Sequence, residues 1–473
     1  MKKGIFIILC ILFSIFSALG VTETDAAPKK TKWNYNKIIK KTSGAFTYHA
    51  ITSKDNKKAW IYYIKINTRK KHTSMAIPST IKGKKVTRIG CSYKMTPLEE
   101  GTYNIFGAYV EHYHGYYATG PGLKKIKTVR IPDTVETIQA STFSGLTSLR
   151  EIKIPKKVKQ LYWETFYGCR SLQTVYLPDG FEKLDNLAFE ECPKLENVIL
   201  SPQNKFYSIN GKCIISRKNQ ALICALAGGE QLSIPEGTRK ITTYALNNCT
   251  AQTVNIPASV TNIEKDAFSL PYSFDNMNIK NVTVSPKNQT YAKDGQCIYN
   301  IKDCSLAVAI INENGLLYIS DKVHKLTDKY NVIGSDPNPE DEDFYEFEAV
   351  YFPETLSTVE DCSFEYLEDA DRVYFFSALP PKLKNSSPPS FCDMYVPKGS
   401  LKLYKKWCKD DVYNTDWIDN WYTFDPEELK QELYEAGIIT SNTDPQGGKS
   451  CTTQKGRKTT CRKLPGYSSP SFR

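Results

Sequence analysis

The sequence offers few side chains that could catalyse a reaction or hold a metal ion. Of five histidines, His112 and His114 stand two residues apart beside Glu111, which would place both imidazoles on one face of a strand. A tetrahedral site needs further ligands, and Cys91 lies far earlier in the chain. We interpret the pair as loop histidines, and we expect no metal site and no cofactor.

Motifs for nucleophilic or phosphate chemistry are absent as well. The chain contains no HExxH, no Gly-x-Ser-x-Gly, no paired-cysteine zinc spacing and no calcium loop. Gly448-Lys449-Ser450 ends like a phosphate-binding loop, but Thr443 stands where the first glycine is required, and no strand precedes it. A catalytic cysteine–histidine pair stays open as an alternative, although nothing in the sequence singles out one cysteine as the nucleophile. We expect no catalytic residue and a protein that is not an enzyme.

Binding is the chemistry that the residue spacing favours. A four-residue motif recurs along the chain: an apolar residue, any residue, an apolar residue and usually proline. The residue between the two apolar positions must face solvent, because side chains alternate along a strand. The middle residues are Ala76, Arg130, Lys153, Tyr176, Ile199, Ser233, Asn255, Thr283, Tyr318, Tyr351, Tyr374 and Tyr395.

The last four of these middle residues are tyrosines on strands that should be consecutive or nearly so. They would form an exposed aromatic stripe roughly 15 Å long, and tyrosine suits protein or sugar partners. The candidate binding residues are Tyr318, Tyr351, Tyr374, Tyr395, Tyr176, Arg130 and Lys153. The alternative is that tyrosine is simply a good strand residue that packs on cross-strand neighbours.

The element that must position these residues is a repeat. In Val129-Arg130-Ile131-Pro132 and the next two copies, the prolines fall 23 residues apart. A phenylalanine or leucine marks each unit, with an aliphatic residue five positions earlier: Phe143, Phe166, Phe189, Leu246, Phe268 and Phe364 after Ile138, Leu161, Leu184, Ile241, Ile263 and Val359. Period two predicts a short strand, which the proline ends.

A fixed period of this length is typical of a solenoid, whose units bury their apolar faces only by stacking. We predict an α/β solenoid: a leucine-rich-repeat-like, right-handed coil with one short parallel β-strand per turn of about 23 residues. Short helical or irregular segments lie opposite the strands, and terminal caps close the coil.

The pattern A-F-x-x-C-x-x-L-x-x-V-x-L-P resembles the BspA-like leucine-rich repeat family. It is seen in Thr165-Phe166 to Pro178 and in Ala188-Phe189 to Leu200. Further similar segments are an opening unit at 81–90, asparagine-tyrosine-glycine excursions at 204–214 and 288–298, and a closing unit at 396–401 with Tyr404 and Trp407. The resemblance covers about residues 45–410. It implies a bacterial secreted or cell-surface protein, with adhesion and binding of host proteins. Together with the tyrosine stripe, it leads us to expect a module that binds an extracellular protein or glycan.

The chain is expected to divide into five parts. Residues 1–27 have two lysines, an apolar run and small residues, and so predict a secretory signal peptide, with a retained membrane anchor as the alternative. The rest comprises 28–120, a basic opening unit with a tyrosine-rich insertion; 121–410, the solenoid with an acidic insertion near 327–348; 411–440, a cap with a short helix from Asp425-Pro426; and 441–473, a basic flexible tail.

The location expected from these parts is secreted or cell surface. The sequence has no wall-sorting motif and no lipobox, and the mature chain has no long apolar run for a transmembrane helix. The tyrosine-rich insertion adds Tyr113, Tyr116 and Tyr117 as candidate binding residues, since insertions in solenoids often carry partner specificity. Neutral drift in loop length is the alternative.

Charge is distributed unevenly along the chain. Residues 28–88 hold 17 Lys or Arg and one acid, whereas residues 321–371 hold 3 Lys and 16 acids. The pattern fits solubility, attraction of an acidic wall or membrane polymer to the basic N-terminal region and tail, or end-to-end self-association as a structural surface protein. Export argues against nucleic acid as a partner. The oligomeric state stays open.

Cysteines follow the repeat. Cys169, Cys192 and Cys249 occupy one phase, and Cys213 and Cys297 share another context, so we expect buried core residues rather than disulfide partners. Cys451 and Cys461 in the tail are the candidates for a disulfide.

Overall fold

The computed structural model describes residues 31–66, 72–90, 102–103, 109–110, 125–268, 279–333, 347–361, 364, 370–389, 392–409, 418–435 and 439. The chain forms two compact units, Met1–Asp425 and Pro426–Arg473. The second unit contains helix α3 (Pro426–Glu435), which begins where the sequence predicted. The predicted signal peptide and basic tail lie outside the described residues, and the capping role of the helix stays a prediction.

The first unit opens with a mixed sheet. Its strands are β1 (Trp33–Ser43), β2 (Phe46–Ser53), β3 (Lys58–Ile66), β6 (Lys84–Ile89) and β10 (Thr137–Ile138), with β5 (Thr80–Ile81) paired to β6. The first three strands pair antiparallel, and β3, β6 and β10 then pair parallel. One face of this sheet joins the main core through residues such as Ile39 and Ile61.

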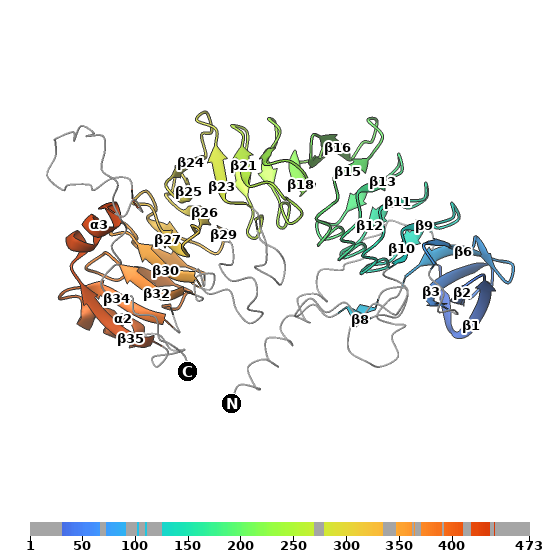
Figure 1. The fold of residues 1–473 in the computed structure, drawn as a ribbon, viewed down its shortest axis with the longest axis horizontal. Coiled ribbons are helices and arrows are strands. Elements are labelled where there is room, and N and C mark those ends of the chain that lie inside the picture. The colour runs from blue at the N-terminus through green and yellow to red at the C-terminus, as the bar shows by residue number, and fades with distance from the viewer. Residues whose placement is uncertain are drawn as a thin grey trace. The chain divides into compact units, whose positions relative to one another are not determined.

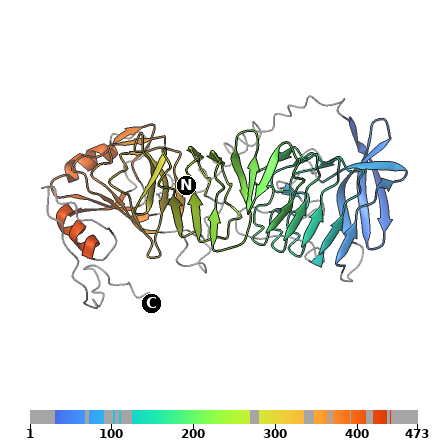
Figure 2. The ribbon, with the colours of Figure 1, turned by 90° about the horizontal axis from the view of Figure 1, so that it is seen from above.

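Parallel ladders follow, and their register is the sequence repeat. A five-stranded ladder contains β4 (Ser74–Ala76), β9 (Thr128–Arg130), β11 (Glu151–Lys153), β13 (Thr174–Tyr176) and β15 (Asn197–Ile199), side by side in chain order (Figures 1 and 2). Ile152 pairs with Val129 and Val175, 23 residues away on either side. These inward residues are buried, and each strand ends just before an apolar residue that proline follows in four of the five copies.

Each turn of this region carries a second strand, which corrects the prediction of one strand per turn. The aliphatic residues five positions before the phenylalanines lie in strands of two residues, as in β12 (Gln160–Leu161) and β14 (Lys183–Leu184), which pair parallel. Backbone amides at these positions need partners, and a second parallel ladder supplies them. The phenylalanine rings stack behind it, with centroids 5.5 Å apart for Phe143 and Phe166.

The two excursions recognised in the sequence have the same hydrogen bonds. Asn204 donates from Nδ2 to the carbonyls of Asp179 and Phe181, and the hydroxyl of Tyr207 accepts from the amide of Leu184. In the second excursion, Asn288 and Tyr291 make the equivalent bonds to Pro257, Val260 and Ile263. Each motif therefore satisfies backbone groups where the two-residue ladder would otherwise stop.

The middle of the unit contains three sheets. The first has β16 (Tyr207–Asn210), β17 (Cys213–Ser216), β18 (Ala221–Ala225), β20 (Lys240–Ile241) and β22 (Asn262–Ile263). The second has β19 (Gln231–Ser233), β21 (Thr253–Ile256) and β23 (Asn281–Val284). The third has β24 (Tyr291–Asp294), β25 (Cys297–Asn300), β26 (Leu306–Ile310) and β29 (Asn331–Ile333).

The C-terminal part of the unit again has two parallel ladders. One contains β27 (Leu316–Tyr318), β30 (Phe347–Phe352), β32 (Ala370–Phe375), β34 (Cys392–Pro397) and β35 (Ile418–Phe424). The other contains β28 (Lys325–Leu326), β31 (Thr358–Glu360) and β33 (Lys382–Lys384). Helix α2 (Leu401–Lys409) follows β34 and buries Tyr404 and Cys408.

One further strand pair lies early in the chain, where β7 (Thr102–Tyr103) pairs with β8 (Tyr109–Val110).

Candidate functional site

The outward position of the early ladder, β4-β9-β11-β13-β15, is exposed as expected. Arg130 and Lys153 are exposed, and Tyr176 and Ile199 have 39% and 50% of their surface accessible. Lys153, Tyr176 and Ile199 are direct cross-strand neighbours. This face therefore presents two cations and two apolar side chains to solvent, whereas their role in binding stays a prediction.

The same position of the middle ladder, β19-β21-β23, carries small polar residues. Asn255 donates from Nδ2 to Ser233 Oγ at 3.2 Å and accepts from Thr283 Oγ1 at 2.6 Å. These three side chains line a shallow hollow of about 410 Å³ together with Ile234, Ile256, Pro257, Val284, Ser285 and Pro286. The lining has no charged residue, so this part of the surface can bind only through neutral hydrogen bonds and apolar contact.

The late ladder, β27-β30-β32-β34-β35, carries a continuous row of tyrosines, which we call the tyrosine ladder: Tyr318, Tyr351, Tyr374, Tyr395 and Tyr422. Cross-strand pairing places them in register. The ring centroids of Tyr351 and Tyr374 lie 4.6 Å apart, those of Tyr374 and Tyr395 lie 4.2 Å apart, and those of Tyr395 and Tyr422 lie 4.7 Å apart, all stacked. Tyr318 joins Tyr351 with a tilted ring at 6.3 Å.

Stacking changes the exposure that the sequence predicted. Tyr351 and Tyr374 are only 6% and 8% exposed, so the expectation that both face solvent is wrong. Each ring is covered on both faces by its neighbours, and Phe376 and Phe424 contact the ladder from the next outward row. Burial raises the pKa of the Tyr374 hydroxyl, and the neighbouring tyrosines raise it further. Tyr318 and Tyr395 are half-buried.

Tyr422 is the exposed end of the tyrosine ladder, and sequence reasoning missed it. It is 42% exposed and stacks on one neighbour only. The alternation of Trp421, Tyr422, Thr423 and Phe424 is a strand signal, but Phe424 stands where the repeat motif has proline, and the stretch falls beyond the last recognised unit. Beside it, Asn420 donates to Asp393 at 2.9 Å, so the end of the ladder combines a ring with polar groups.

The repeats themselves match a known family. Residues 122–221 and 227–314 match the BspA type leucine rich repeat region, in six copies. These two stretches therefore contain BspA-type leucine-rich repeats. This confirms the resemblance that the sequence motifs indicated.

Comparison with other proteins adds the following similarities. A leucine rich cell surface protein from Faecalibacterium prausnitzii is 15% identical over 72% of this chain and 96% of its own, with a TM-score of 0.35. The pneumococcal vaccine antigen PcpA is 13% identical over 82% of this chain and 98% of its own, with a TM-score of 0.29. A leucine-rich repeat protein from Eubacterium ventriosum is 12% identical over 77% of this chain and 80% of its own, with a TM-score of 0.28. No curated protein matches the chain.

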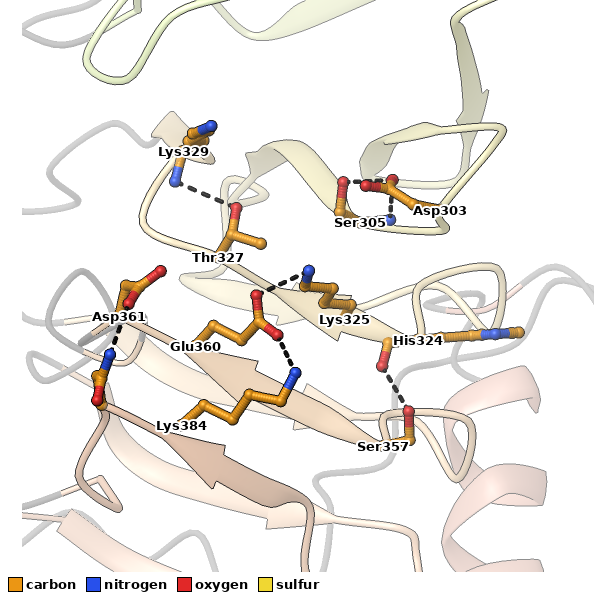
Figure 3. A network of polar contacts seen from close by, with 11 residues as sticks. Asp303, Ser305, His324, Lys325, Thr327, Lys329, Ser357, Glu360, Asp361 and Lys384 are labelled. Atoms are coloured by element: carbon orange, nitrogen blue, oxygen red, sulfur yellow. Dashed lines mark hydrogen bonds and ion pairs between the residues drawn. The ribbon is translucent and has the colours of Figure 1, made fainter.

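The ladder of β28, β31 and β33 carries an ion-pair network (Figure 3). Glu360 accepts from Lys325 at 2.7 Å and from Lys384 at 2.6 Å, one lysine from each neighbouring strand. The two lysines hold the pKa of Glu360 below its usual value. The next residue, Asp361, accepts from Asn385 at 3.4 Å. The charge of Glu360 is thus neutralised by lysines from the two neighbouring strands.

The turns of the early BspA-type repeats bury acids instead. Glu164 accepts a hydrogen bond from Ser141 at 3.1 Å, and burial raises its pKa to about 8. Glu190 is buried as well, and burial together with Glu164 and Glu191 raises its pKa to about 9. Within the described part of the chain, Glu190 Oε2 has no hydrogen-bond partner. Both carboxyls are therefore stable in the protonated, neutral form at neutral pH.

The nine described cysteines are free thiols. The in-phase residues Cys169 and Cys192 donate to the carbonyls of Phe143 and Phe166, each at 3.2 Å, and burial raises the pKa of Cys169 to about 12. The prediction that in-phase cysteines are core residues is confirmed. Their thiols hold the carbonyl of the preceding repeat, which explains the fixed phase. Cys304 alone among the nine is not fully buried.

Several expected sites lie outside the described residues. These are the insertion tyrosines Tyr113, Tyr116 and Tyr117, the histidine pair His112 and His114, the tail cysteines Cys451 and Cys461, and most of the acidic insertion. Among the described residues, no group of three His, Cys, Asp or Glu side chains could hold a metal ion. No helix in the described part is long and apolar enough to cross a membrane.

Proposed function

We propose that this chain is an exported bacterial protein, secreted or held at the cell surface, that binds an extracellular protein or glycan through the outward faces of its strand ladders. The observation that carries the proposal is the tyrosine ladder with its exposed end at Tyr422. A rigid row of stacked rings presents amphipathic contact area at low entropic cost. The coil is proposed to be right-handed, since parallel crossovers favour that hand.

The binding surface is proposed to be graded along the ladder. Tyr351 and Tyr374 have little area left for a partner, so they support the surface. Tyr395 and Tyr422 offer ring edges and hydroxyls, with Asn420 and Asp393 as hydrogen-bonding neighbours. Tyr176 and Ile199 of the early ladder are a second, separate contact area.

The test is a glycan and extracellular-protein array probed with the mature chain, residues 28–473. The double variant Tyr395→Ser/Tyr422→Ser should lose the ligands that the unchanged chain binds. Tyr434→Ser is the matched control, because Tyr434 is 45% exposed but lies in the second unit. The double variant Tyr176→Ser/Arg130→Ser tests binding through the early ladder separately from binding through the tyrosine ladder. Retention of every ligand by both double variants would refute binding through the outward faces.

Self-association is a second candidate, favoured by the separation of 17 basic residues in 28–88 from 16 acids in 321–371. Electrostatic association of this kind weakens with salt, because the Debye length falls from about 30 Å at 0.01 M to about 8 Å at 0.15 M. Light scattering coupled to size exclusion should then give a larger mass at low salt. A mass equal to the monomer at both salt concentrations would eliminate this candidate.

A further inference from the structure

The outer face of the first sheet is built differently from the other outward faces. The inner face of β1, β2 and β3 joins the main core, whereas the outer face has a small cluster of its own, formed by Trp33, Ile51 and Trp60 with Tyr62 packed against it. The Trp33 and Trp60 rings meet edge to face at 5.3 Å. Such a cluster on the solvent side of a sheet is not needed to close the core.

Aromatic rings continue from this cluster to the surface. Tyr35 packs on Trp60 at 6.4 Å and is 43% exposed, and Ile38 beside it is 54% exposed. On the neighbouring strands, the His49 ring lies 5.1 Å from that of Tyr63 and 6.5 Å from that of Tyr62. The outer face therefore carries a platform across three strands, in which Tyr35 and Ile38 are exposed, His49 and Tyr63 are half-buried, and the two tryptophans are buried.

Cations surround this platform. Arg88 stacks over Trp60 at 4.8 Å and over Trp33 at 5.8 Å. Lys40 is exposed on β1 opposite His49, and Lys65 is exposed on β3, and both lower the pKa of His49, after the larger effect of its burial. No ion pair joins Lys40 or Lys65 to an acid of the described residues. Asp55, the single acid of residues 28–88, is bonded to Ser53 in the β2–β3 turn.

One buried donor in this face lacks an acceptor. Trp60 Nε1 donates to the carbonyl of Gly90 at 2.7 Å, but Trp33 Nε1, in a side chain that is 9% exposed, has no hydrogen-bond partner among the described residues. An unpaired buried donor costs about 1–3 kcal/mol, so native structures rarely keep one without a role. An unpaired donor beside Lys40, Lys65 and the rings favours an acceptor oxygen from outside the chain.

We propose that the outer face of the first sheet, made by Trp33, Tyr35, Lys40, His49, Lys65 and Arg88, binds an acidic polysaccharide. Sugar rings place apolar faces on the exposed side chains of Tyr35 and Ile38, and their carboxylates lie between Lys40 and Lys65. These lysines are two strands apart, on the order of 10 Å, whereas phosphates follow one another at roughly 3.4 Å along a nucleic-acid strand. The spacing therefore favours a polymer with sparse charge. The proposal rests on the extracellular location proposed above.

Titration of the mature chain with hyaluronan, which carries one carboxylate per disaccharide, tests the site, with tryptophan fluorescence as the readout. Lys40→Glu/Lys65→Glu should weaken the apparent Kd about tenfold or more, equivalent to 1.4 kcal/mol. Lys218→Glu/Lys302→Glu is the matched control: it makes the same change in net charge at two exposed lysines in turns outside the first sheet. This control should weaken binding less than about twofold, because charges away from the site contribute little. Any general attraction of hyaluronan to the basic tail is the same in both variants. Equal weakening by the two double variants would overturn the site.

The identity of the ligand is tested separately. Trp33→Phe keeps an aromatic side chain but removes the indole N–H donor, and it should weaken hyaluronan binding severalfold while leaving the circular dichroism spectrum of the chain unchanged. Dextran should not bind. Tighter binding of single-stranded DNA or of phosphatidylglycerol vesicles than of hyaluronan would overturn the choice of a polysaccharide. Loss of array ligands in Tyr395→Ser/Tyr422→Ser with intact hyaluronan binding would leave this inference standing, so the two proposals fail independently.

Discussion

Two ladders of this protein place tyrosine at the same position of the repeat and give it different surroundings. In the early ladder, Tyr176 lies between Lys153 and Ile199 and is 39% exposed. In the late ladder, Tyr374 lies between Tyr351 and Tyr395 and is 8% exposed. The backbone is the same in both cases, since each tyrosine is on the outward side of a parallel strand. Exposure at this position is therefore decided by the cross-strand neighbours, and with it the choice between binding and stability.

The largest effect expected from this comparison is on the free energy of unfolding. Tyr374→Ser removes a ring that is stacked on both faces, and we expect a loss of about 3 kcal/mol, as for other buried aromatic truncations. Tyr176→Ser, at the same repeat position, should change stability by less than about 0.5 kcal/mol. Urea unfolding followed by circular dichroism measures both. Similar losses for the two variants would show that neighbours do not decide the role.

The comparison also separates what the sequence could predict from what it could not. The period, the inward residues and the buried cysteines follow from local spacing, because each is a property of one repeat. The burial of Tyr351 and Tyr374 depends on how four side chains from four repeats pack together. The second strand at Leu161 and Leu184 was missed because two residues are too few to show period two. The paired tryptophans on the first sheet lie outside the repeat and had no periodic signal.

Acids of the two regions have pKa values shifted in opposite directions: that of Glu190 in an early turn is raised, and that of Glu360 in the late ladder is lowered. The variant Glu190→Gln tests the raised pKa. Burial raises the pKa of Glu190 to about 9, above its value in the unfolded chain. The folded state then binds the extra proton, so its stabilising contribution is complete below about pH 4.5 and is lost as pH rises towards 9. Glutamine mimics the protonated acid without titrating.

The thermal midpoint of the unchanged chain should accordingly fall between pH 6 and pH 9, and that of Glu190→Gln should fall less. Glu196→Gln is a suitable control, because Glu196 is an exposed acid of the same repeat. Parallel pH profiles for the unchanged chain and Glu190→Gln would contradict the assignment of a protonated buried acid.

A substitution that makes the early ladder resemble the late one tests whether cross-strand neighbours decide the stability that a tyrosine contributes. Lys153→Tyr places a second tyrosine directly across from Tyr176, and stacking between them should add about 0.5–1 kcal/mol of stability. The double variant Lys153→Tyr/Tyr176→Ser completes a double-mutant cycle that isolates the pair. A coupling energy near zero would mean that the tyrosine ladder needs Phe376 and Phe424 as well as its own members.

The smallest effect concerns Glu360 in the late repeats, where Lys325 and Lys384 lower the pKa of the carboxyl (Figure 3). A lowered pKa reverses the sign found for Glu190: the stabilising contribution is present above the unfolded value and is lost as pH falls below about 4.5. Glu360→Gln should therefore lower the thermal midpoint slightly at pH 7 and not at pH 3. The network is open to solvent, so 0.5 M salt should reduce the difference at pH 7. A difference that persists unchanged at pH 3 would mean that packing of the side chain, rather than its charge, joins β28, β31 and β33.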